Sequence, residues 1–307
     1  MSANVSLPPV DGSVAYRIVH TTTYDYEFPM SDGYTIAHLL PRPTPHQVVE
    51  SAEVIVTPEP DERAEHFDAF GNRVLQVGVH RSHEALTLVA KSEVVVEVED
   101  VAGPGPPWEA VADQIRELQG ADALTVRPFA ASSSFVDLDI HGAELRRLAD
   151  SAFPPGRPIV DGARALCTLI HETFGYDPAF TDVSTPLSAV LEARRGVCQD
   201  FAHLATGCVR VIGLAARYVS GYVETDPATT RSAADASHAW CSVWVPDQGW
   251  IDFDPTNGHL PADRHITVAW GRDYGDVAPV RGVVIGPTAG QTLSVDVDVR
   301  RVGAVPV

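Results

Sequence analysis

The sequence predicts an α+β protein in which an antiparallel β domain is followed by a core of helices and then strands. Residues 14–98 contain short β-branched runs separated by Pro, Gly and Asp. Residues 110–211 place apolar side chains at helical spacing, and the chain is again rich in strand-forming residues from 216 onward. Because the helices precede the strands rather than alternate with them, the second region is expected to be α+β.

The N-terminal domain is expected to span residues 14–98. Its clearest strands are the runs VESAEVIVTP, NRVLQVGVH and ALTLVAKSEVVVEVE. The dense Gly and Pro residues of the following segment, VEDVAGPGPPWE, interrupt any regular element. Residues 99–109 are therefore predicted to be a linker.

The second domain is expected to span residues 110–307. Amphipathic patterns predict helices at 110–120, 142–153, 161–176 and 187–196, and a further helix beginning at Cys198. The remainder, from ARYVSGYVET to QTLSVDVDVRRV, is rich in strand-forming residues. We assign these C-terminal strands to the same core domain.

Composition limits the function classes. The 307 residues, 45% hydrophobic and 21% charged, are enough for two domains with cores. A formal net charge of -19 argues against nucleic acid as a partner, because phosphate binding depends on clustered Lys and Arg. The four cysteines are too few and too scattered for a disulfide scaffold, so reduced thiols are expected.

Targeting, cofactor and metal signals are weak. The N-terminus lacks a basic start followed by an apolar stretch, and no segment approaches the roughly 18 apolar residues of a membrane span. We expect a cytoplasmic protein with no membrane partner. No Gly-rich phosphate loop follows a strand, and His80 and His83 lack the further ligands of a tetrahedral site. No cofactor and no metal are therefore expected.

Cys198 lies directly before an apolar-periodic helix and is preceded by Arg194, Arg195 and Gly196. A helix N-terminus presents unpaired backbone N–H groups and a partial positive charge, which favour a thiolate over a thiol. This position predicts a nucleophilic cysteine.

The segment SHAWCSVWVPDQGWIDFDPTNG reads as a β-hairpin that supplies a base and a group to orient it. If Val245 pairs with Gly249, Trp240 faces Asp254 across the two strands. His238 then lies diagonal to the Asp254 carboxylate on the same face, within side-chain reach. A register slip of one residue would destroy this arrangement.

The motifs GVCQDFAH, ARYVSGY, SHAWCSVW and GWIDFDPTNG resemble the core motifs of the transglutaminase-like superfamily, in the same order of Cys, His and Asp. In that family the cysteine attacks an amide or ester carbonyl, the histidine shuttles the proton and the aspartate holds the imidazole. The resemblance implies these roles for Cys198, His238 and Asp254, together with a papain-like core. YRIVHTTTYDYEFP, LLPRPTPHQ and DAFGNRV resemble the β-rich N-terminal domain of a bacterial two-domain subgroup, and GRDYGDVAPVRGV resembles its C-terminal segment.

Other residues near these positions have structural explanations. His203 lies five helical steps, roughly 140°, from Cys198 and is expected to be a hydrogen-bond partner rather than the base. Asp252 shares a strand face with Asp254 but lies further from His238 in the expected register. Asp200, in the first helical turn, is expected to cap the helix. The remaining cysteines, Cys167, Cys208 and Cys241, are expected to pack in the core.

An oxyanion hole requires two donors. The backbone N–H of Cys198 is one candidate, and the side chain of Tyr176 or Gln199 is a candidate for the second. Simple packing against the helix is an equally good explanation of Tyr176.

The expected activity is cysteine-dependent acyl transfer on amide or peptide bonds of a peptide or protein substrate, through a thioester intermediate. Water as acceptor gives a peptidase or amidase, which the resemblance favours. A primary amine as acceptor gives a protein-glutamine transglutaminase. A non-catalytic binding or assembly module that keeps the fold is a third possibility, and the oligomeric state is open.

The N-terminal domain carries motif-like residues without obvious chemistry: Arg42, Asp68, Gly71 and Asn72. DAFGN is expected to form a tight hairpin turn, where Gly and Asn tolerate positive φ, rather than to bind substrate. Whether this domain covers the Cys198 cleft, selects substrate or joins subunits is left open by the sequence.

Overall fold

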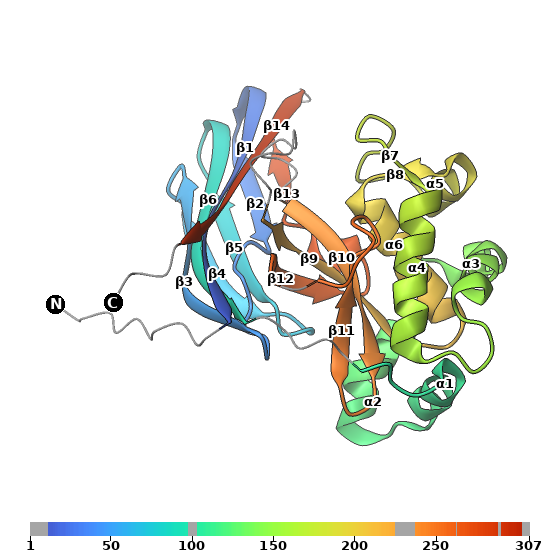
Figure 1. Cartoon of the computed structure of the whole chain (residues 1–307). Helices are drawn as coiled ribbons and strands as arrows, with labels where there is room; N and C mark the ends of the chain where they lie inside the picture. Colours follow the sequence, from blue (N-terminus) through green and yellow to red (C-terminus); the bar gives the residue numbers. More distant parts are fainter. Residues whose placement is uncertain (1–11, 98–102, 225–236, 262, 288–289, 303–307) are drawn as a thin grey trace.

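The computed structural model describes residues 12–97, 103–224, 237–261, 263–287 and 290–302. A sandwich of two β sheets lies on one side, a third four-stranded sheet lies in the middle, and helices cover the face of this third sheet that points away from the sandwich (Figure 1). Within these residues, none of the helices combines the length and the apolar character that a membrane crossing requires.

The sandwich consists of two antiparallel sheets with strand orders β14-β1-β6-β3 and β13-β2-β5-β4. The strands are β1 (Ser13–Met30), β2 (Asp32–Ala37), β3 (Gln47–Thr57), β4 (Glu62–Phe67), β5 (Arg73–Val79), β6 (His83–Glu97), β13 (Val280–Ile285) and β14 (Gln291–Val302). Side chains from both sheets, including Val54, Leu75 and Leu88, pack into one buried cluster. The expected antiparallel β domain is thus confirmed.

The last two strands pair with the first two. β13 runs antiparallel to β2, and β14 runs antiparallel to β1 over twelve residue pairs, from Ala15 with Val302 to Tyr26 with Gln291. The C-terminal strands assigned above to the core domain therefore complete the sandwich instead. The alternating sequence pattern of β13 and β14 predicts strands but does not identify the strands with which they pair. In the structure, β14 covers the edge of β1 and β13 covers the edge of β2.

The core has one sheet of strand order β11-β10-β9-β12. Its strands are β9 (Ala216–Val223), β10 (Ser237–Val245), β11 (Gly249–Phe253) and β12 (His265–Gly271). The helices are α1 (Trp108–Glu117), α2 (Gly120–Val126), the 3-10 helix η1 (Arg127–Ala130), α3 (Leu138–Ala152), α4 (Ile159–Thr173), α5 (Leu187–Ala193), α6 (Cys198–Val211) and α7 (Tyr274–Val277). A short parallel pair, β7 (Gly175–Tyr176) with β8 (Arg195–Gly196), leads into α6.

Helix α6 is the centre of the core. It contacts β9, β10, α3, α4 and α5, and its residues from Asp200 to Arg210 are all buried. The thiol of Cys241 on β10 donates to the carbonyl of Ala202, which ties the helix to the sheet. The N-terminal end of α6, with Cys198, is thereby fixed relative to β10, the strand that carries His238.

Candidate active site

Cys198 is the first residue of α6, as expected, and Val197 precedes it in extended conformation. Asp200 Oδ2 accepts hydrogen bonds from the Val197 N–H (2.8 Å) and the Thr181 hydroxyl (2.8 Å). The expected capping role of Asp200 is confirmed. Burial raises the pKa of Asp200, and these two hydrogen bonds oppose that rise. Gly196 is required here, because a Cβ at this position would lie 2.6 Å from Asp200 Oδ2.

The hairpin has the expected register. Val245 pairs with Gly249 and Cys241 pairs with Phe253, which continues to place Trp240 opposite Asp254. The His238 Nε2 atom lies 2.8 Å from Asp254 Oδ2, and both side chains are buried. The carboxylate can only accept, so Nε2 carries the proton and Nδ1 is the other ring nitrogen available for proton transfer.

The pKa of His238 depends on both of its neighbours, Asp254 and Cys198. Burial alone would lower the pKa of His238, but the Asp254 charge and hydrogen bond, together with a hydrogen bond to the Cys198 side chain, raise it to about 10. Burial alone would raise the pKa of Asp254, but His238 and then His265 hold it well below its ordinary value. The geometry therefore favours an imidazolium between a carboxylate and a sulfur atom.

Two further residues hold Asp254. His265 Nε2 lies 2.9 Å from Asp254 Oδ2, and Asn257 Nδ2 donates to the same oxygen at 2.7 Å. The backbone N–H groups of Thr256 (2.9 Å) and Asn257 (3.1 Å) donate to Oδ1. Sequence reasoning missed both side chains. Asn257 follows Asp254 in the DPTNG turn and could have been found there, whereas His265 is brought in only by the pairing of β12 with β9.

The structure places the other sequence candidates in structural roles. His203 stacks on Phe135, accepts a hydrogen bond from the Tyr274 N–H (3.1 Å), and has its pKa lowered by burial to about 3. Asp252 accepts from Trp240 Nε1 (2.8 Å) and from the Ser242 hydroxyl. The expectation that His203 is a hydrogen-bond partner is confirmed.

The cysteines also divide as expected. Cys167, Cys208 and Cys241 are buried, and only Cys198, among the cysteines, has partial exposure. Burial raises the pKa of each of the three buried thiols. Reactivity toward a dissolved substrate is therefore restricted to Cys198.

The candidate oxyanion residues lie near the start of α6. Tyr176 is on β7, pairs with Gly196 and contacts the Phe201 ring edge-on at 6.5 Å. Gln199 follows Cys198 and donates to the Val183 carbonyl at 3.3 Å. Both assignments remain predictions.

Among the residues that the structure describes, one set of side chains could hold a metal ion: His238, Asp254 and His265 each offer a ligand atom, and these atoms lie within 4.8 Å of one another. The same three atoms are already joined by the two hydrogen bonds at Asp254 Oδ2. All three residues are buried, so an ion would have to displace those bonds and find an entry path.

A cavity of about 400 Å³ lies between the sandwich and the core sheet, and its lining includes Gln47, Arg217, Asp252 and His265. The Arg217 guanidinium lies between the rings of Trp250 (3.7 Å) and Trp270 (4.1 Å). Cys198 does not line this cavity, so the cavity is not where the thiol would meet a substrate.

Comparison with known proteins gives two family matches. Residues 16–95 match the bacterial transglutaminase-like N-terminal region, and residues 146–255 match the transglutaminase-like superfamily. The chain is 37% identical to the uncharacterized protein Rv2569c of Mycobacterium tuberculosis over 97% of each chain. The chain therefore belongs to the transglutaminase-like superfamily.

One more distant relative and one similar solved structure have descriptive names. A segment of 129 residues, 39% of this chain and 19% of the relative, is 32% identical to a protein-glutamine gamma-glutamyltransferase of Pseudomonas aeruginosa. The crystal structure of a proposed cysteine protease from Cytophaga hutchinsonii is similar with a TM-score of 0.74 at 21% identity, covering 96% of this chain and 93% of that chain. This structural likeness shows that the two proteins have the same fold over both domains.

Proposed function

We propose that this protein is a cysteine-dependent acyl-transfer enzyme acting on amide or peptide bonds, with hydrolysis as its main reaction. The observation that supports this most strongly is the position of His238, which contacts both the Cys198 side chain and the Asp254 carboxylate. A nucleophile, a base and a group that orients the base are thus within contact of one another.

In the first step, the Cys198 sulfur attacks the carbonyl carbon of the substrate. The bond between that carbon and the amine breaks, and the leaving amine takes the proton of the His238 imidazolium. The product is an acyl thioester on Cys198. Asp254 fixes the ring orientation and stabilises its positive charge throughout.

In the second step, neutral His238 takes a proton from the acceptor as the acceptor attacks the thioester carbon. Water as acceptor releases a carboxylic acid, whereas a primary amine releases a new amide. The thiolate and the imidazolium are regenerated in both cases. The same three residues serve either acceptor, so Cys198, His238 and Asp254 support acyl transfer without selecting the acceptor.

Single-turnover trapping tests this proposal. The protein is mixed with an activated acyl amide, quenched in acid, and analysed by peptide mass spectrometry for an acyl group on Cys198. Partition of the thioester between water and added primary amines then measures the acceptor preference. Absence of a thioester with every acyl donor would contradict the enzymatic proposal, and hydrolysis without amine incorporation would exclude the transglutaminase alternative.

A second candidate is a binding module, favoured by the formal net charge of -19 and the large N-terminal sandwich, which could recognise a protein partner. A Cys198→Ala variant separates the two. Loss of turnover with partner binding kept would show that both roles exist, whereas partner binding without turnover in the unaltered protein would favour the binding module alone.

A further inference from the structure

Two side-chain amides of the N-terminal domain bind the core strand β12 through its backbone. Gln47 Nε2 donates to the Thr267 carbonyl (2.7 Å), and Gln47 Oε1 accepts from the Thr267 N–H (2.8 Å). Asn72 Nδ2 donates to the Trp270 carbonyl (2.8 Å), and Asn72 Oδ1 accepts from the Trp270 N–H (3.0 Å). Each amide thus makes the pair of hydrogen bonds that a neighbouring strand would make.

β12 needs such partners because it is one of the two edge strands of the core sheet. Unpaired N–H and C=O groups at a sheet edge cost stability when they are buried. The register of β12 against β9 also shifts between Thr267 and Ala269. A bulge of this kind bends a strand locally. The two amides bind on either side of the bulge and so fix its shape.

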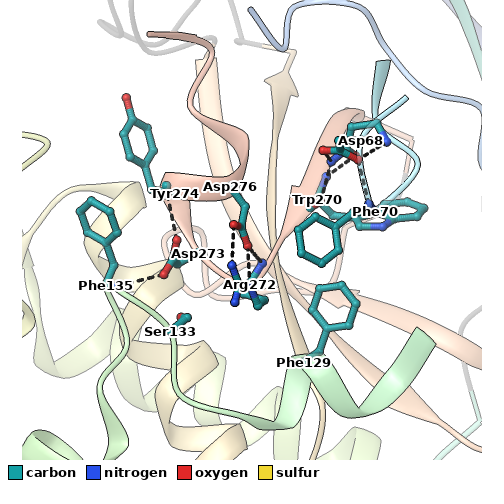
Figure 2. A network of polar contacts seen from close by, with 12 residues as sticks. Asp68, Phe70, Phe129, Ser133, Phe135, Trp270, Arg272, Asp273, Tyr274 and Asp276 are labelled. Carbon is teal, nitrogen blue, oxygen red and sulfur yellow. Dashed lines mark hydrogen bonds and ion pairs between the residues drawn. The ribbon is translucent and has the colours of Figure 1, made fainter. Parts of the chain in front are cut away.

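Both amides are themselves held in place. Gln47 and Asn72 are buried, and Gln47 Nε2 also donates to the Arg42 carbonyl (2.7 Å). Asn72 Nδ2 donates to Asp68 as well (2.8 Å), and the Arg42 guanidinium lies 3.2 Å from the centre of the Trp270 ring. Figure 2 labels Asp68 and Trp270, the two residues that Asn72 Nδ2 joins in this network. The motif residues Arg42, Asp68 and Asn72 thus act together on β12.

The strand held in this way also carries His265. His265 lies two residues before Thr267, so the two side chains share one face of β12. Burial lowers the pKa of His265, which keeps the ring neutral, and its Nε2 proton is used for Asp254. Within the described residues, the other ring nitrogen, Nδ1, is buried without a hydrogen-bond partner. In the described part of the chain, the His265 side chain is thus held by Asp254 and by ring packing, and its place depends on the backbone of β12.

We propose that Gln47 and Asn72 are positioning residues of the active site, through which the N-terminal domain fixes β12 so that His265 holds the Asp254 carboxylate against His238. This inference rests on the proposed function only in taking Asp254 and His238 as the reactive pair. It assigns the N-terminal domain a part in assembling the site rather than in covering it.

The test is the solvent exchange of the ring N–H protons of His238 and His265, measured by NMR on protein labelled with 15N-histidine. Gln47→Met keeps the length of the side chain and removes both hydrogen bonds to Thr267. We expect exchange at His265 to accelerate by about tenfold or more, with a smaller acceleration at His238. Gln47→Glu, which keeps the acceptor and lacks the N–H donor, should give an intermediate value.

Val56→Ala is the matched control. Val56 lies on β3, the strand that begins with Gln47, and is buried in the sandwich core, in a hydrophobic cluster that contains no residue of β12. It should lower the melting temperature and leave both exchange rates unchanged. Equal exchange rates in Gln47→Met, Gln47→Glu and the unaltered protein would overturn the inference, as would an equal acceleration in Val56→Ala.

The readout needs no substrate, so the inference and the proposed function can fail separately. Accelerated exchange in a protein that never forms a thioester would leave the positioning role standing and remove the acyl-transfer activity. Unchanged exchange in the Gln47 variants of a protein that turns over normally would remove the positioning role and leave the acyl-transfer activity standing. In an active protein, we also expect Gln47→Met to lower kcat by about tenfold with KM unchanged, because β12 does not carry Cys198.

Discussion

Removing the charge of Asp254 should lower the pKa of His238 and slow the alkylation of Cys198. Both carboxylate oxygens of Asp254 accept hydrogen bonds, whereas the amide of Asp254→Asn has one oxygen and one NH₂ group. The NH₂ group must face either the donors of His238, His265 and Asn257 or the two backbone N–H groups. Neither orientation therefore satisfies all partners. The pKa of His238, raised to about 10 mainly by Asp254 against the effect of burial, should then fall toward its ordinary value of 6.5. With a pKa near 6.5, the imidazolium fraction at pH 8 falls from about 99% toward about 3%.

The assay has two parts. NMR of 15N-histidine protein follows the titration of His238 directly, and iodoacetamide alkylation followed by peptide mass spectrometry follows the reactivity of Cys198. We expect the alkylation rate at pH 7 to fall by about tenfold or more in Asp254→Asn, because the thiolate loses its cationic partner.

Asp252→Asn is the matched control, since Asp252 lies on the same strand face and bonds to Trp240 and Ser242 instead of a histidine. It should leave the His238 titration and the alkylation rate unchanged. The reasoning is refuted if His238 titrates as in the unaltered protein after Asp254→Asn, or if Asp252→Asn has the same effect.

Three other outcomes follow from the same contacts. Native-state alkylation should label Cys198 and leave the three buried cysteines unlabelled until denaturant is added, as measured by peptide mass spectrometry. His203→Phe should keep the alkylation rate of Cys198 but cost about 1–3 kcal/mol in urea unfolding, because the Tyr274 N–H loses its acceptor; a loss of alkylation would make His203 a functional residue. The raised pKa of His238, about 10 against 6.5 in the unfolded chain, contributes stability that is complete below pH 6.5 and is lost as pH rises toward 10, by up to about 1.4 kcal/mol per pH unit. Urea unfolding at pH 7 and 9.5 should show this alkaline loss, and Asp254→Asn should lack it.

The parts of the site that were predictable from sequence are those that local rules determine. The hairpin register follows from a turn of known length and a period of two, and it brings His238 to Asp254. The helix start at Cys198 and the cap by Asp200 depend on residues within one turn of each other.

The parts that were missed depend on pairing between distant segments. His265 reaches Asp254 only because β12 pairs with β9 across more than forty residues of chain, and a strand pattern does not name its partner. The same reason explains why β13 and β14 were assigned to the wrong domain. Loop-closing contacts of this range are set by the whole fold and not by local propensity.

The return of β13 and β14 to the sandwich links these observations. The chain leaves the sandwich after β6, builds the core, and re-enters the sandwich directly after β12 and α7. β12 is therefore held at its C-terminal side by the covalent path to β13 and along its edge by Gln47 and Asn72. Its histidine in turn holds the carboxylate that orients His238. Under the positioning role proposed above, the two domains assemble this site together, because the strand that carries His265 belongs to the core sheet but takes its position from the sandwich.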